Sequence, residues 1–573
     1  MGPCADVSWC RHFSRRAIRS WEAIALRTNG IFGRRRASRV AASIGSLALV
    51  IGLAAACGGG GTGGGGESGG TYSYQLGEPE NPFLPANTTE SEGHKVLTAL
   101  WTQLVTFDQD GNLTYDGVAE SVTSDDNTTW TVTLKPDWTF HDGTPVTAES
   151  YVRAWNYGAL STNAQGASYF FENIQGYDDL QAPEDGQPAA TEMSGLRATD
   201  DSTITVTLKE PFSIYPVTLG YTAFDPLPDA FFNDPTGFGR RPIGNGPFMA
   251  QEDWVPNQGF TVVRYDNYSG SEPAQADGVE FRVYTEPTTA YNDVQAGNLD
   301  LMKTLPPDAL GTAEQTFGDR YLQEPRPSIT SLAFPTYDQR YADPRVRQAI
   351  SMGIDRGAIA ESIFLGSRTA ARSFVSPVVE GYREDACATT CDLNVEQANQ
   401  LLDEAGFDRS QPIDLWFNAG GGHEEWMLAL GNQLRTNLGV EFNLRGDLQF
   451  AQYLPLQDER GMTGPFRAGW IMDYPSMYSF LQPLYGTAAL APAGSNVTFY
   501  SSPAFDQAIS DGNNAPDVDA ATAEYQRAED ILITDMPATP LFYELDQMVW
   551  SPRISNIEYL VNGDIDLAAV TVD

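Results

Sequence analysis

Basic residues, and lysine above all, are scarce in this sequence. It contains 35 Lys and Arg against 75 Asp and Glu, and only four of the basic residues are Lys. Beyond residue 56, 26 basic and 73 acidic side chains remain, a net charge of −47. Nucleic-acid binding needs a basic surface, so we expect no nucleic-acid partner. The negative charge either enriches cationic ligands near a cleft or reflects a general acidic bias.

Histidine is also rare. Only His94, His141 and His423 follow the first 56 residues. No H-E-x-x-H or G-x-S-x-G motif occurs, and the glycine clusters lack the strand-to-helix context of a phosphate loop. These absences predict a protein that is not an enzyme and holds no metal or cofactor. A hydrolase with paired carboxylates is the alternative, because spacing in sequence does not set spacing in the fold.

Five cysteines limit the possible disulfides. Cys4 and Cys10 lie in the first 56 residues, and Cys57 directly follows them. In an oxidising compartment the remaining pair, Cys387 and Cys391, is expected to form a local disulfide. A metal pair is the alternative, but it needs further ligands that the sequence does not offer.

The amino terminus predicts export. A basic region at residues 34–39 precedes a short apolar run, residues 40–56, which is too short for a typical membrane span. After Cys57, the glycine-rich residues 58–70 form a flexible tether. This arrangement resembles a bacterial lipoprotein signal, in which residues 1–56 are removed and Cys57 receives the lipid. Release as a free secreted protein and retention as an uncleaved anchor are the alternatives.

Local patterns indicate mixed strands and helices. Residues 130–135 and 203–208 alternate with a period of two, as half-buried strands do. Asp343-Pro344 predicts a helix start, with Val346, Ala349, Ile350 and Gly353 on one face of that helix. Asn394 and Gln397 resemble a capping box, and Gly406 is placed to end the helix that follows. About 500 residues beyond the tether exceed a single core, so we expect two or three domains.

The segment Arg467-Ala468-Gly469-Trp470-Ile471-Met472-Asp473-Tyr474 places a guanidinium and a carboxylate six residues apart. Such a segment suits both ends of a zwitterion. The string RAGWxxDY resembles the ligand-contacting segment of the oligopeptide-binding proteins, extracytoplasmic receptors of ABC importers in the peptide and nickel family. Four further blocks resemble the same family: LKPDWTFHDGTPVTAESYVRAWNY (134–157), IGNGPF (243–248), DPRVRQAISMGIDRGAI (343–359) and DLNVEQANQLLDEAGF (392–407).

The resemblance implies roles for individual residues. Asp473 would pair with the α-ammonium of a bound peptide, and Arg467, with or without His423, would pair with its carboxylate. The backbone at Gly469 and Ile471 would hydrogen-bond an extended peptide. Trp470 either walls a side-chain pocket or packs in the core, and His423 either faces the ligand or is an exposed helix cap. His141 lies in a block that is structural in the family.

The family also implies an α/β fold of two lobes that close on a ligand, of the large three-domain type. One lobe would comprise residues 71–98, 229–326 and 546–573, with a small domain inserted at 99–228. The second lobe would comprise residues 327–545.

The function implied is a lipid-anchored peptide receptor at the outer face of the cytoplasmic membrane. It would act as a monomer and deliver peptides to a permease pair with its ATPases. A receptor of the same fold for a nickel chelate, an oligosaccharide or another solute is the alternative, and a secreted hydrolase is a further one.

Overall fold

A computed structural model describes residues 69–573 apart from residues 80, 184–185, 420–421 and 492–493. The leader, the predicted lipid site Cys57 and most of the tether therefore lie outside the described residues. Within the described ranges, no helix combines the length and the apolar character needed to cross a membrane.

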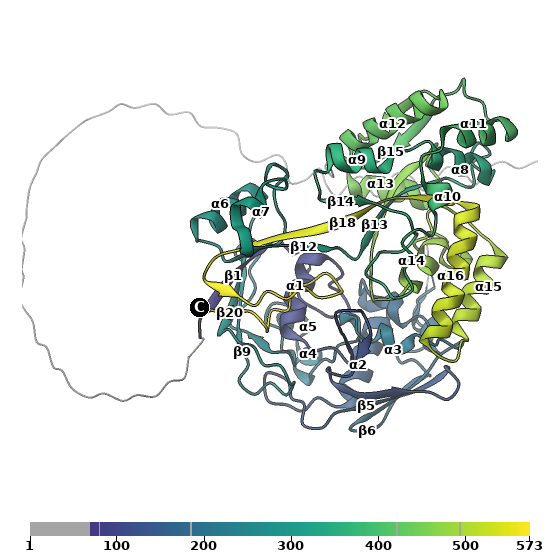
Figure 1. The fold of residues 1–573 in the computed structure, drawn as a ribbon. Coiled ribbons are helices and arrows are strands. Elements are labelled where there is room, and N and C mark those ends of the chain that lie inside the picture. Colours follow the sequence, from purple (N-terminus) through teal and green to yellow (C-terminus); the bar gives the residue numbers. More distant parts are fainter. Residues whose placement is uncertain (1–68, 80, 184–185, 420–421, 492–493) are drawn as a thin grey trace, which may run out of the picture. The chain divides into compact units, whose positions relative to one another are not determined.

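The central element is a 12-stranded mixed sheet (Figure 1). Its main path runs β16 (Phe442–Arg445), β15 (Ile413–Trp416), β17 (Phe466–Ile471), β13 (Ser328–Ala333), β18 (Ala538–Trp550), β11 (Leu301–Met302), β1 (Thr71–Leu76), β10 (Gly278–Val283), β9 (Phe260–Arg264), β8 (Phe248–Ala250). Two more strands, β12 (Tyr321–Pro325) and β14 (Arg368–Ala370), pair with β18.

The long strand β18 joins the two halves of this sheet. Its first half pairs antiparallel with β13 and β14, and its second half pairs antiparallel with β11 and β12. Figure 1 shows it as the extended yellow strand between the β13 and β12 labels. The described residues belong to one compact unit, which is not divided further. The expected domain boundaries at residues 98, 228, 326 and 545 are therefore not tested and stay predictions.

Three smaller sheets complete the strands. Four antiparallel strands form one sheet in the order β4 (Ala119–Thr123), β5 (Thr129–Leu134), β7 (Thr203–Thr207), β6 (Leu196–Asp200). The other two are the pairs β2 (Thr106–Phe107) with β3 (Leu113–Thr114), and β19 (Ile554–Ser555) with β20 (Thr571–Val572). β5 and β7 confirm the two strands expected from alternation: Val132 and Ile204 are buried, whereas their neighbours along each strand are less so.

Two helices begin at the predicted caps, although α8 ends at Met352, so Gly353 follows that helix and is not on its face. The side chain of Asp343 accepts a hydrogen bond from the Arg345 N–H at the start of α8, and that of Asn394 accepts one from Gln397 at the start of α11. Gly406, with φ +66°, follows α11 as expected. The α-helices are α1 (Ser91–Leu100), α2 (Ala148–Ala159), α3 (Tyr215–Thr218), α4 (Asp229–Asn233), α5 (Pro235–Phe238), α6 (Pro287–Ala296), α7 (Ala313–Phe317), α8 (Pro344–Met352), α9 (Arg356–Ile363), α10 (Ala388–Cys391), α11 (Val395–Glu404), α12 (Glu424–Leu438), α13 (Phe450–Asp458), α14 (Tyr478–Tyr485), α15 (Pro503–Asn513) and α16 (Val518–Asp535).

Two sequence features have structural roles. Cys387 and Cys391 are joined in a disulfide beside α10. The ring of His141 bridges two of the quoted blocks: its Nδ1 accepts from the Gly244 N–H at 3.1 Å, and its Nε2 lies 3.1 Å from the Gly246 carbonyl oxygen. His141 therefore fixes a loop of the fold, and it is not among the residues that line the cavity described below.

Candidate functional site

One edge of β17 is open for most of its length. The strand pairs antiparallel with β13 from Phe466 to Ile471, but it pairs with β15 only at Phe466. The Met472 N–H donates to the Pro327 carbonyl oxygen at 2.8 Å, so Met472 faces β13. Because the polar groups of successive residues in a strand alternate in direction, those of Gly469 and Ile471 point to the open edge. This edge offers hydrogen bonds to an extended ligand.

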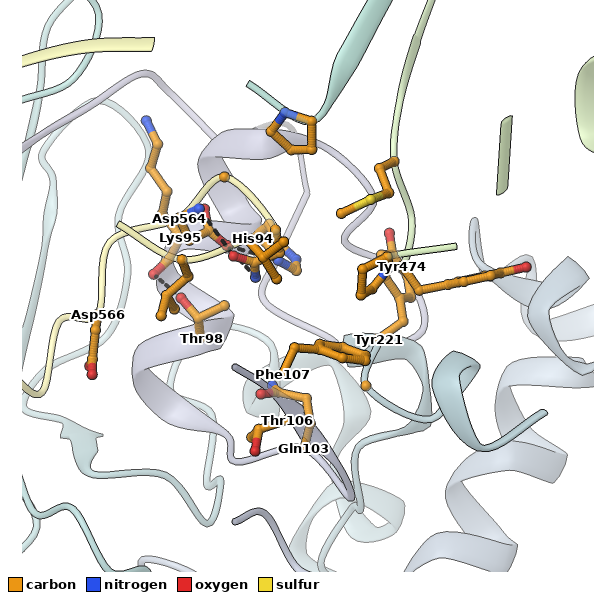
Figure 2. A pocket seen from close by; sticks show the side chains of 18 of the residues that line it. His94, Lys95, Thr98, Gln103, Thr106, Phe107, Tyr221, Tyr474, Asp564 and Asp566 are labelled. Atoms are coloured by element: carbon orange, nitrogen blue, oxygen red, sulfur yellow. Dashed lines mark hydrogen bonds and ion pairs between the residues drawn. The ribbon is translucent and has the colours of Figure 1, made fainter. Parts of the chain in front are cut away.

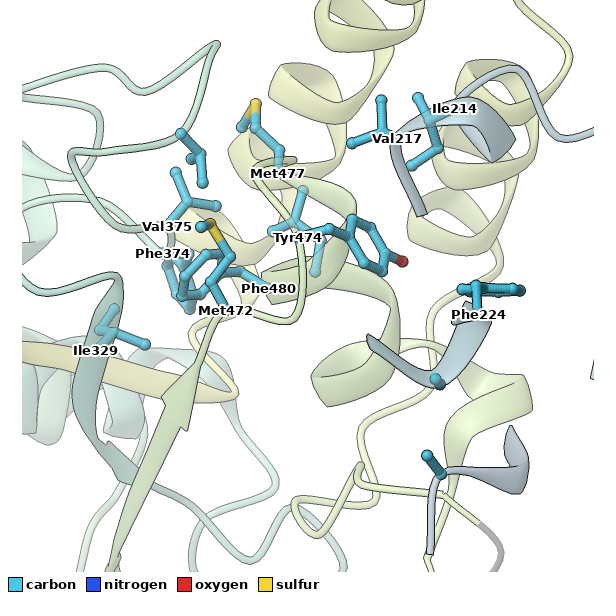
Figure 3. Packing of buried hydrophobic residues seen from close by; sticks show 14 of the residues in the cluster. Ile214, Val217, Phe224, Ile329, Phe374, Val375, Met472, Tyr474, Met477 and Phe480 are labelled. Carbon is cyan, nitrogen blue, oxygen red and sulfur yellow. The ribbon is translucent and has the colours of Figure 1, made fainter. Parts of the chain in front are cut away.

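The turn after β17 is held by buried neighbours of Asp473. Met472 and Tyr474, on either side of it, are buried, as are Met477 and Phe480 at the start of α14 (Figure 3). The backbone N–H of Asp473 donates to the Ser479 hydroxyl at 3.1 Å. The packing of these neighbours fixes the backbone at this position. Asp473 itself lines the cavity described below.

The Asp473 carboxylate has no cationic partner and accepts no hydrogen bond within the described part of the chain. Burial raises its pKa from the ordinary value of 3.8 to about 7. An unpaired carboxylate in a low-dielectric site is costly, and a bound cation removes that cost.

Arg467 lies at the other end of the same strand. Among the described residues its guanidinium forms no ion pair, and its buried Nε has no hydrogen-bond partner. Burial lowers its pKa. A Cβ at Gly469 would lie 2.8 Å from Arg467 Nη2, so the glycine makes room for the guanidinium. Tyr453 of α13 holds the strand here, since its hydroxyl donates to the Arg467 carbonyl oxygen at 2.8 Å.

His423 precedes α12 and is buried, so the expectation of an exposed helix cap is wrong. Its Nδ1 accepts a hydrogen bond from Trp426 Nε1 at 3.3 Å. Burial, assisted by the charges of Arg467 and Arg368, lowers its pKa to about 4. His423 is therefore neutral near pH 7, with its proton on Nε2.

A cavity of about 980 Å³ adjoins the open edge. Gly469, Trp470, Ile471 and Asp473 line it, whereas Arg467 and His423 do not appear among the described residues of its wall. Ile471 is 46% exposed, which leaves the edge accessible. Trp470 is half-buried, packs against the core and lines the cavity, and its role as the wall of a side-chain pocket stays a prediction. The cavity is large enough for a ligand of several hundred daltons.

Another part of the cavity wall comes from segments that carried no functional signal in the sequence, and Figure 2 labels several of its residues. Tyr169 and Tyr221 belong to it, with His94 on α1 and Asp564 near the C-terminus. His94 Nε2 lies 3.2 Å from Asp564 Oδ2, and the His94 ring stacks on Tyr221. Burial alone would lower the pKa of His94, but the charge and hydrogen bond of Asp564 raise it. Only the fold brings residues 94, 221 and 564 together.

The described residues contain no group of three or more His, Cys, Asp or Glu side chains that is able to hold a metal ion. Among the described residues, Arg467 of β17 and Asp473 of the turn after it are charged groups of opposite sign without ion-pair partners.

The site thus combines an open strand edge with a large cavity in a mixed α/β fold, an arrangement that can hold an extended solute. Residues 114–491 match the family described as bacterial extracellular solute-binding proteins, family 5. The chain belongs to this family. Its fold is the two-lobed, large type of periplasmic binding protein, as the solved structures below indicate.

Curated relatives match most of the chain. The periplasmic murein peptide-binding protein MppA of Escherichia coli is 27% identical over 495 residues, which cover 84% of this chain and 89% of MppA. The periplasmic oligopeptide-binding protein OppA of Escherichia coli is 26% identical over 469 residues, which cover 79% of this chain and 83% of OppA.

Solved structures agree in fold. The unliganded open form of MppA superimposes with a TM-score of 0.72 at 23% identity, covering 89% of this chain and 98% of MppA. OppA from Burkholderia pseudomallei gives a TM-score of 0.69 at 23% identity, covering 88% of this chain and 99% of that protein.

Proposed function

We propose that this protein is a receptor that binds short peptides in the cavity and delivers them to an ABC import permease. The observation that carries the proposal is the half-buried Asp473 carboxylate, whose pKa is raised by desolvation and which has no cationic partner among the described residues. A peptide α-ammonium would supply the missing charge. The names of the relatives MppA and OppA, which record peptide binding, support the same ligand class.

The peptide would run along β17. Gly469 and Ile471 would hydrogen-bond its backbone, which gives affinity that does not depend on ligand side chains. Arg467, with the neutral His423 donating from Nε2, would pair with its carboxylate. Asp473 lies four positions after Gly469, beside which the Arg467 guanidinium lies, so the two charges would bracket a short peptide. Trp470 would wall a side-chain pocket.

Binding would be coupled to closure of two lobes. We place one lobe at residues 71–98, 229–326 and 546–573 with the domain 99–228 inserted, and the other at residues 327–545. Closure would exclude water and so strengthen the attraction between the paired charges. The ligand would shift the equilibrium between the open and closed forms, and the permease would recognise the closed form. The receptor would act as a monomer, without catalysis, tethered to the outer face of the cytoplasmic membrane through a lipid on Cys57.

Mass spectrometry of the ligand released from purified protein tests this function. We expect peptides with free amino termini, depleted in Asp473→Asn protein purified in parallel. Asp447 is exposed, so Asp447→Asn is the matched control and should retain the wild-type ligand set. Recovery of a sugar or a metal chelate in place of peptides would contradict the proposal.

A further inference from the structure

The loop after β7 docks on the carboxyl end of α15, 299 positions further along the chain. The Ser213 N–H donates to the Asn513 carbonyl oxygen at 2.9 Å, and the Ser213 hydroxyl donates to the Gly512 carbonyl oxygen at 2.9 Å. The Asn127 side-chain amide donates to the Ala515 carbonyl oxygen at 2.7 Å. The last carbonyl groups of a helix lack partners within it, so Ser213 and Asn127 supply donors where α15 ends.

The docked loop also packs through aromatic rings. Phe212 is only 4% exposed, and its ring lies 5.1 Å from that of Tyr478, measured between centroids. Tyr478 packs in turn on Tyr525 of α16 at 5.7 Å, and the Tyr525 hydroxyl donates to Asn513 Oδ1 at 2.8 Å. We call this packing, together with the three hydrogen bonds, the α15 contact. Separating its two sides would expose apolar rings to water, so the contact stabilises the arrangement in which they touch.

The α15 contact adjoins the helix that supports Asp473. Tyr478 is the first residue of α14, and the next residue, Ser479, accepts the Asp473 backbone N–H at 3.1 Å. Phe212 and the donor residues of the contact are not among the described residues that line the cavity. The contact therefore lies beside the ligand site, and a ligand in the cavity would not touch it.

The two sides of the α15 contact belong to different proposed lobes. Phe212 and the donor residues fall in the inserted domain 99–228, whereas their partners fall in the lobe 327–545. Resting on the proposed function, we propose that the α15 contact is a latch that forms when the lobes close and breaks when they open. A hinge motion that parts these segments must break the three hydrogen bonds and the ring packing. The latch thus stabilises the closed form, and the apparent affinity for ligand falls with the fraction of protein that closes.

Variants that remove the donors of the latch test this proposal. Ser213→Ala removes the hydroxyl, and Asn127→Gly removes the amide at a position whose φ of +54° suits glycine. Stopped-flow tryptophan fluorescence with tetra-alanine measures both rates, because Trp470 lines the cavity. We expect the double variant to release tetra-alanine at least tenfold faster than the wild type. Its association rate should stay within threefold, because the ligand enters the open form. Ser213→Ala alone, the milder change, should release tetra-alanine about threefold faster.

A control variant and a second measurement separate closure from folding. Ser362 is exposed on α9 and its hydroxyl donates within that helix, so Ser362→Ala should keep both wild-type rates. In small-angle X-ray scattering the ligand-free double variant should be more extended than the wild type, and saturating tetra-alanine should give both the same dimensions. Unchanged release rates, or faster release with unchanged ligand-free dimensions, would overturn the latch and leave peptide binding intact. Failure of the wild type to bind tetra-alanine would overturn the proposed function, and this inference with it.

Discussion

Arg467 and Asp473 carry opposite charges at the two ends of one strand-and-turn segment, and neither forms an ion pair with any other described residue. Two half-buried carboxylates of the site are matched within the protein: Asp564 by His94 and Asp546 by Lys303. The unmatched pair is thus a local property of the β17 segment, and it suits a ligand with a charge of each sign.

The raised pKa of Asp473 predicts a pH-dependent stability of the ligand-free protein. Asp473 titrates near pH 7 when folded, against 3.8 as the ordinary value, so the folded state holds the proton more tightly. The free energy of unfolding therefore falls as the pH rises from about 4 to about 7, by up to roughly 4 kcal/mol. Asp473→Asn should be more stable than the wild type at pH 8 but not at pH 4.

Urea unfolding of both proteins at the two pH values measures this difference. The exposed Asp447→Asn variant is the control and should show no such trend. A stability difference between Asp473→Asn and wild type that is the same at pH 4 and pH 8 would refute the raised pKa and the unpaired state of the carboxylate.

The open edge of β17 predicts an alternating effect of ligand N-methylation. A peptide amide that faces Gly469 or Ile471 donates to the strand edge, so its methylation should weaken binding by about 1 kcal/mol or more. Methylation of the alternate peptide amides, which point away from β17, should be tolerated. Calorimetry with a set of singly methylated peptides gives the pattern, and equal losses at every position would exclude strand pairing.

The disulfide predicts protected thiols at residues 387 and 391. Peptide mapping after alkylation should find both cysteines labelled only if a reductant is added first. Since the closed loop is short, the Cys387→Ser/Cys391→Ser variant should lose about 2 kcal/mol of unfolding free energy. Labelling of both thiols in untreated native protein would contradict the pairing.

The proposed anchor predicts the location of the protein. Cys57→Ser should move it from the membrane fraction to the medium, because the lipid is the only anchor in the proposal. Immunoblotting of the two fractions measures this, and a wild-type protein found wholly in the medium would exclude lipidation.

Local sequence signals predicted several helices and strands and the β17 side of the cavity, but not the rest of the cavity wall. Alternation located β5 and β7, and caps located α8 and α11, because these features depend on residues close in sequence. The RAGWxxDY string located the open-edge segment. His94, Tyr221 and Asp564 carried no such signal, since only the tertiary fold brings these helix and loop residues together across more than 460 residues. The burial of His423 likewise depends on Trp426 and on distant arginines.

The most direct test of the central claim is a double-mutant cycle on the Asp473 contact with the ligand amine. Asp473→Asn should weaken peptide binding by about 2–5 kcal/mol, and N-acetylation of the peptide should do similar damage to the wild type. If both changes break one contact, acetylation should cost the Asp473→Asn protein far less than it costs the wild type. Calorimetry on the four combinations measures this coupling. Fully additive losses would show that Asp473 does not hold the amine.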